Sequence, residues 1–169
     1  ARVAPSPDGG FVAAWSSWGQ DGDGWGVFAR PFSADGRPLG VERQVNAAWR
    51  HFQWQPQVLW CGSSLWALWA NGTGVPCTGQ DMPADCATGP FLRLLANASA
   101  DSANASADAS AAGGALAGGW RPLEEVDLKG EQPLAPTAAC GSGDAVTALW
   151  LQEGGRQVRW SFASPPGGA

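Results

Sequence analysis

Apolar and polar positions alternate only loosely along this chain, and the apolar runs are short. The run Phe11–Trp15 is apolar at every position, so a strand there has two apolar faces. Glycine and proline bound such runs, and they punctuate short strands more often than long helices. A strand that is apolar on both faces fits a sheet lying between two other sheets. The pattern therefore predicts an all-β protein of short, sandwiched strands.

The same pattern occurs three times. Each copy has a short apolar stretch, a glycine-containing turn and an apolar strand that ends in tryptophan, which is typical of a β-hairpin. The copies lie at 3–15, 56–69 and 136–150. A weaker match follows in each copy, at 26–32, 89–95 and 157–162. A second one follows in the first two copies, at 36–45 and 120–126, and the third copy stops before it. One unit is then four antiparallel strands in roughly 50 residues, as in a blade of a β-propeller. A β-sandwich with coincidental similarity is the alternative.

The repeats divide the chain into a first copy at 1–55, a second at 56–135, a partial third at 136–163 and a linker at 164–169. The second copy holds a low-complexity insertion at 96–119, for which we expect a surface loop. A closed propeller needs about four to eight blades, more than these copies supply. We therefore expect a fragment of a larger propeller or array, completed by further blades or by another chain.

Four cysteines allow three pairings. Cys77 and Cys86 bracket a short loop that closes easily, and Cys61 and Cys140 hold nearly equivalent positions in the second and third copies. Equivalent positions in adjacent blades face each other, so we predict the disulfides Cys61–Cys140 and Cys77–Cys86. A zinc site is the alternative, but close spacings such as C-x2-C are absent.

The net charge excludes one class of partner, and the sequons indicate the compartment. The net charge of −5 argues against a nucleic-acid partner, which needs a basic face. No apolar run approaches the roughly 20 residues that span a bilayer, so no membrane insertion is expected. N-glycosylation sequons begin at Asn71, Asn97 and Asn104. Together with the even number of cysteines, they predict an extracellular or cell-surface glycoprotein.

Signals for catalysis or metal binding are sparse. Asp21 and Asp23 have the spacing of calcium-loop ligands, but Trp25 stands at the next ligand position. Calcium at these two residues is the one cofactor candidate, and a glycine-rich hairpin turn is the alternative. The chain has a single histidine, His51, and no Gly-x-Ser-x-Gly motif. We predict that the protein is not an enzyme.

The chain has 11 tryptophans and no tyrosine. Trp15, Trp69 and Trp150 end equivalent strands and are expected in the core. The tryptophans predicted at turns and linkers are better placed for exposure, and their flat rings suit contact with sugars. These candidates for glycan contact are Trp18, Trp25, Trp49 and Trp54.

Two segments resemble known repeats. Residues 6–11 are similar to part of the Asp-box of sialidase-like propellers, with Ala13 in place of the expected aromatic residue. That family's activity requires a tyrosine, which this chain lacks. Residues 15–40, continued by Val45 and Asn46, more closely resemble the β-propeller-like repeats of large secreted microbial surface proteins. The cysteines and sequons depart from the bacterial pattern, and the Ala/Gly/Ser/Pro bias resembles algal wall or flagellar-surface glycoproteins.

The resemblance implies an architectural or adhesive role without catalytic residues. The expected function is that of a structural or adhesive glycoprotein module in cell-surface, cell-wall or flagellar-surface assembly. Its expected partners are other protein chains or further blades of the same chain, and glycans as well. The alternative is a lectin-like carbohydrate-binding module that uses the loop tryptophans.

Overall fold

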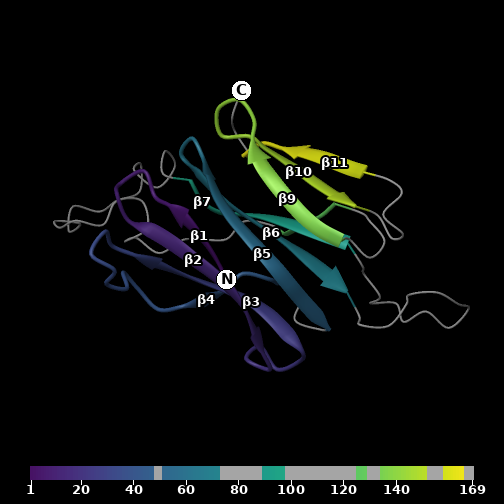
Figure 1. Ribbon diagram of the computed structural model, residues 1–169, viewed down its shortest axis with the longest axis horizontal. Coiled ribbons are helices and arrows are strands. Elements are labelled where there is room, and N and C mark those ends of the chain that lie inside the picture. The colour runs from purple at the N-terminus through teal and green to yellow at the C-terminus, as the bar shows by residue number, and fades with distance from the viewer. Residues whose placement is uncertain (48–50, 73–88, 98–124, 129–133, 152–157, 166–169) are drawn as a thin grey trace, which may run out of the picture.

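A computed structural model describes residues 1–47, 51–72, 89–97, 125–128, 134–151 and 158–165 (Figure 1). Every helix or strand in these residues is a β-strand, which confirms the all-β prediction. The strands are β1 (Arg2–Pro5), β2 (Phe11–Trp18), β3 (Trp25–Phe32), β4 (Arg43–Gln44), β5 (Phe52–Cys61), β6 (Ser64–Gly72), β7 (Gly89–Asn97), β8 (Glu125–Asp127), β9 (Leu134–Cys140), β10 (Val146–Leu151) and β11 (Val158–Ala163).

The strands form three antiparallel groups, here called sheet 1 (β1–β4), sheet 2 (β5–β8) and sheet 3 (β9–β11). Each predicted hairpin is present, as β1–β2, β5–β6 and β9–β10. A single parallel pair, Trp25 with Phe52, joins sheets 1 and 2 into one continuous 8-stranded sheet. Sheet 3 is separate and 3-stranded. Neither sheet closes on itself, so the described residues form an open arrangement.

Sheet 2 lies between the other two, and β6 is buried along its whole length. Leu65, Ala67 and Trp69 point into a core shared with sheet 1, where Val12 and Val27 are also buried. The alternate positions point into a second core shared with sheet 3, formed by Cys61, Trp66, Leu68, Leu92, Leu94, Val146, Ala148 and Trp150. Since successive strand residues point to opposite faces, a strand covered on both sides needs apolar side chains on both, as the buried run Leu65–Ala70 of β6 has. The expectation of a sandwiched strand thus fits β6, whereas β2, for which it was made, buries only one face, through Val12 and Ala14.

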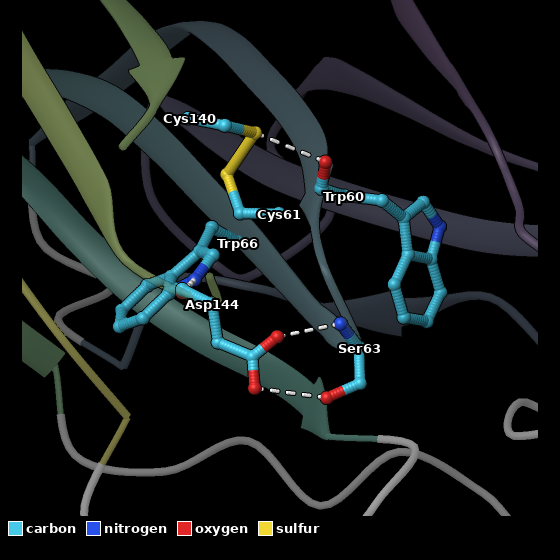
Figure 2. Close-up of a disulfide and its surroundings, with 6 residues drawn as sticks. All are labelled: Trp60, Cys61, Ser63, Trp66, Cys140 and Asp144. Carbon is cyan, nitrogen blue, oxygen red and sulfur yellow. Dashed lines mark hydrogen bonds between the residues drawn. A yellow bond between two sulfur atoms is a disulfide. The ribbon is translucent and has the colours of Figure 1, made fainter. Parts of the chain in front are cut away.

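A disulfide and a carboxylate hold sheet 3 against sheet 2 (Figure 2). Cys61 ends β5 and Cys140 ends β9, and their Cα atoms lie 5.1 Å apart in the disulfide that the repeats predict. Beside it, Asp144 accepts hydrogen bonds from Ser63 N at 2.6 Å and from Ser63 Oγ at 2.9 Å. The indole Nε1 of Trp66 donates to Asp144 O at 2.9 Å. The predicted pair Cys77–Cys86 lies outside the described residues.

Gln57 makes a second connection between these sheets. Its Nε2 donates to Pro136 O at 2.8 Å, and its Oε1 accepts from Ala138 N at 3.2 Å. The side-chain amide thus presents one donor and one acceptor to β9, as a backbone residue of a neighbouring strand does. The contact fixes the position of β9 along β5.

Candidate functional site

Trp18, Trp25, Phe52 and Trp54 form an aromatic cluster that reaches the surface. Trp18 and Trp25 form the last pair of the β2–β3 hairpin, and their rings meet edge to face with centroids 5.4 Å apart. The Phe52 ring lies 5.7 Å from Trp18 and 5.8 Å from Trp54. The cluster therefore combines two residues of sheet 1 with two of sheet 2.

Strand pairing brings these four residues together. Phe52 and Trp54 are two positions apart on β5 and share a face of the strand. The parallel pair of Trp25 and Phe52 sets the two halves side by side. Gly24 allows the close approach, because it has φ +53° and an added Cβ would lie 2.4 Å from His51 O. The cluster thus depends on the junction between sheets 1 and 2.

The backbone around Phe52 and Trp54 is unusual. His51 (φ 71°) and Gln55 (φ 53°) flank this segment, and they are the only non-glycine residues with positive φ in the described ranges. This left-handed conformation costs roughly 1–2 kcal/mol for a residue with a Cβ. The β5–β6 register also shifts between Trp54 and Gln57. The fold therefore maintains local strain where it presents the two aromatic rings.

Replacing Gln55 with glycine tests this strain. We expect Gln55→Gly to raise the free energy of unfolding by about 0.5–1 kcal/mol, because relief of the left-handed strain exceeds the entropy that glycine adds to the unfolded chain. Urea unfolding measures the change. The matched control is Gln57→Gly, which removes the contacts with β9 and lowers stability. A lower free energy of unfolding in Gln55→Gly would contradict the assignment of backbone strain to Gln55.

Two cluster members are well exposed, Trp18 at 62% and Trp25 at 40%, while Phe52 and Trp54 are half-buried. Three of the four tryptophans predicted for glycan contact therefore meet in one place. The fourth, Trp49, lies outside the described residues. Phe52 was not predicted, because its segment was expected to be a linker between the first two copies. The structure instead places Phe52 and Trp54 on β5, and Trp18 and Trp25 at the ends of β2 and β3.

Polar side chains form a row that runs inward from the β2–β3 loop. Asn46 Nδ2 donates to Asp21 Oδ2 at 3.2 Å and to Gln53 Oε1 at 3.1 Å. Gln53 Nε2 then donates to Asn71 Oδ1 at 2.9 Å. Gln53 and Asn46 are almost completely buried, so these bonds satisfy groups that would otherwise be costly to bury. The row anchors the loop beside the cluster to sheet 2.

The two carboxylates of the calcium candidate make hydrogen bonds within this loop and to the segment before β5. Asp21 Oδ1 accepts from Asp23 N at 3.4 Å, whereas Asp23 Oδ2 accepts from His51 N at 3.0 Å. The two carboxylates thus serve different donors. Among the residues that the structure describes, no three acidic, histidine or cysteine side chains form a group that could hold a metal ion. Both carboxylates take part in the turn, and calcium binding at Asp21 and Asp23 stays a prediction.

Loss of the Asp21 carboxylate should therefore affect stability whether or not the loop binds calcium. We expect Asp21→Ala to lower the free energy of unfolding by about 1–2 kcal/mol, because the buried Asn46 amide loses an acceptor. Thermal unfolding with and without millimolar calcium measures both effects. Glu42→Ala, on the surface, is the control and should change stability by less than about 0.5 kcal/mol. A rise in Tm on adding calcium would support the calcium site.

The structure bears differently on the glycosylation predicted at the three sequon asparagines. Asn71 is 5% exposed and accepts the hydrogen bond from Gln53. A glycan attaches at Nδ2, so the predicted glycan at Asn71 is incompatible with this buried position. Asn97 ends β7, where it pairs with Ser64, and Asn104 lies outside the described residues. The predictions for Asn97 and Asn104 stay predictions.

Comparison with known proteins adds no relative from which a role could be transferred. No protein-family model matches this chain, and no curated protein matches it either. In the ranges that the structure describes, no helix is long and apolar enough to cross a membrane. The fold and the aromatic cluster therefore carry the functional argument.

Proposed function

We propose that this chain is a non-catalytic, extracellular module of a structural or adhesive glycoprotein. In this proposal sheets 1 to 3 are successive blades of a propeller-like array, and the module acts in cell-surface, cell-wall or flagellar-surface assembly. The observation that carries the proposal is the apolar outer face of sheet 3.

The two faces of sheet 3 have similar chemistry but different surroundings. On the inner face, Val146 and Trp150 are buried against sheet 2. On the outer face, Leu151 pairs with Val158, and Phe162 lies beside Thr147. Val158 is 64% exposed and Phe162 is 55% exposed. Large apolar side chains exposed on one face of a sheet are typical of interaction surfaces. Inside this chain the corresponding faces are covered by another sheet, so a further sheet suits the outer face.

The extracellular part of the proposal rests on covalent chemistry. A disulfide such as Cys61–Cys140 persists in oxidising compartments, and it is compatible with secretion. Peptide mapping of the chain, produced through a secretory pathway, tests this part. We expect the Cys77–Cys86 link, glycan on Asn97 or Asn104, and bare Asn71. Free thiols with bare asparagines throughout would contradict an extracellular module.

Sedimentation velocity over a range of concentrations tests assembly. We expect the wild-type chain to associate reversibly and the variant Val158→Ser/Phe162→Ser to stay monomeric, because two exposed apolar groups leave the outer face. The control is Val41→Ser, which changes a 69% exposed valine outside sheet 3. A wild-type chain that stays monomeric at the highest concentration would contradict assembly through this face.

A lectin-like module is the second candidate, and one specific observation favours it. Trp18 and Trp25 remain exposed although Phe52 packs directly beside them. A cluster that only sealed the junction of the two sheets would be expected to bury its largest rings. Exposed indoles on a rigid support suit sugar binding.

A further inference from the structure

We infer that the aromatic cluster binds uncharged saccharide chains, and that it does so across the junction of sheets 1 and 2. This inference rests on the lectin-like candidate and does not depend on assembly through sheet 3. It adds the ligand class, the role of each residue and a consequence for stability.

The rings supply the apolar part of the site. Trp18 and Trp25 stand at an interplanar angle of 74°, so they form a corner and not a single flat stack. Phe52 and Trp54 are half-buried and support this corner from sheet 2. A pyranose ring has a C–H face that packs on an indole and hydroxyl groups that point sideways. The corner offers a ring face for the C–H groups and leaves its rim open to solvent.

The loop between Trp18 and Trp25 supplies polar groups and a charge that select the ligand. Asp23 is exposed, and its Oδ2 accepts from His51 N at 3.0 Å. Its Oδ1 accepts no hydrogen bond from the described residues, so it is available to a sugar hydroxyl. A carboxylate accepts from hydroxyls and repels other carboxylates or sulfates. The net charge of −5 also repels anionic ligands. The ligand class is therefore uncharged and not anionic.

The site is held in place before any ligand arrives. The left-handed residues His51 and Gln55 bracket its sheet 2 half, and a Cβ on Gly24 would lie 2.5 Å from the Phe52 ring. Strained backbone of this kind concentrates at binding sites, where a fixed geometry lowers the entropy lost on binding.

Because two sheets share the site, binding and stability are linked. Among the described residues, Trp25 and Phe52 form the one backbone pair between the strands of sheets 1 and 2, and side-chain hydrogen bonds support it. A ligand that contacts the cluster binds the folded chain and not the unfolded one, so it raises the melting temperature.

Affinity gel electrophoresis tests the inference. The uncharged probes are hydroxyethylcellulose, galactomannan and xyloglucan, and the anionic probe is polygalacturonate. We expect at least one uncharged probe to retard the protein and to raise its Tm, and polygalacturonate to do neither. Trp18→Ala and Trp25→Ala should each weaken retardation by about tenfold or more, as for other central aromatic contacts. Trp25→Phe should retain part of it.

Val41→Ala is the control, since it removes a 69% exposed apolar side chain outside both the aromatic cluster and sheet 3 and should leave retardation unchanged. Retardation by no uncharged probe, or by polygalacturonate alone, would overturn the inference. So would retardation that survives in Trp18→Ala. Sedimentation velocity of the same variants distinguishes saccharide binding by the cluster from assembly through sheet 3. If Trp18→Ala abolishes self-association, the cluster is a protein contact, and assembly stands without saccharide binding.

Discussion

The double variant Cys61→Ala/Cys140→Ala should lower the free energy of unfolding by about 4.5 kcal/mol, the loop-closure value for a sequence separation of 79. The loss is large because the disulfide restricts the unfolded chain over nearly half its length. It also removes the covalent link between sheets 2 and 3, where few polar contacts remain. Asp144 and Gln57 then hold sheet 3 together with the second apolar core.

Urea unfolding followed by tryptophan fluorescence measures this effect, because Trp66 and Trp150 lie in the core that sheet 3 covers. The control is Cys77→Ala/Cys86→Ala, for which the same relation gives about 2.7 kcal/mol for a closed loop of about ten residues. Sheet 3 separating in an early, distinct transition would agree with its dependence on the disulfide. Equal losses from the two double variants would contradict the long-range role of Cys61–Cys140.

Trp69→Ala should cost about 3–5 kcal/mol, the usual range for removing a large ring from a packed core. Trp69 is 0% exposed on β6, and its ring stacks on Phe91 with centroids 6.0 Å apart. Since other sheets cover both faces of sheet 2, the surrounding strands have little room to fill the cavity.

Trp18→Ala is the matched control for Trp69→Ala, because it removes the same side chain from a position that is 62% exposed. We expect it to change stability by less than about 1 kcal/mol. Urea midpoints of the two variants give the comparison. Similar losses from both would mean that Trp18 contributes to the core and is not available to a ligand.

Local patterns were enough to find much of this architecture. Proline, a short apolar stretch, a glycine turn and a closing tryptophan identified all three hairpins, because turn and strand propensities act within a few residues. The repeat also placed Cys61 opposite Cys140, since equivalent positions in stacked sheets come close together. Trp69 and Trp150 are buried as expected, whereas Trp15 is half-buried on the outer side of sheet 1.

The features that the sequence did not reveal depend on pairing between distant segments. The sequon at Asn71 indicated a glycan, but burial of that side chain follows from Gln53 on the neighbouring strand. Phe52 joined the aromatic cluster through its parallel pairing with Trp25, which no local pattern specifies. The local pattern at Asp21 indicated a calcium ligand, but it did not reveal the hydrogen bond that Asp21 accepts from Asn46, 25 residues away.

The unlike outer faces of sheets 1 and 3 have a consequence for symmetry. Sheet 1 presents Phe11 stacked on Phe32, with Arg30 over the Phe32 ring, whereas sheet 3 presents Val158 and Phe162. Contact between unlike faces is heterologous, so joined copies would all point the same way. The rotation from one sheet to the next then decides whether such copies close into a ring or continue as a filament with two distinguishable ends.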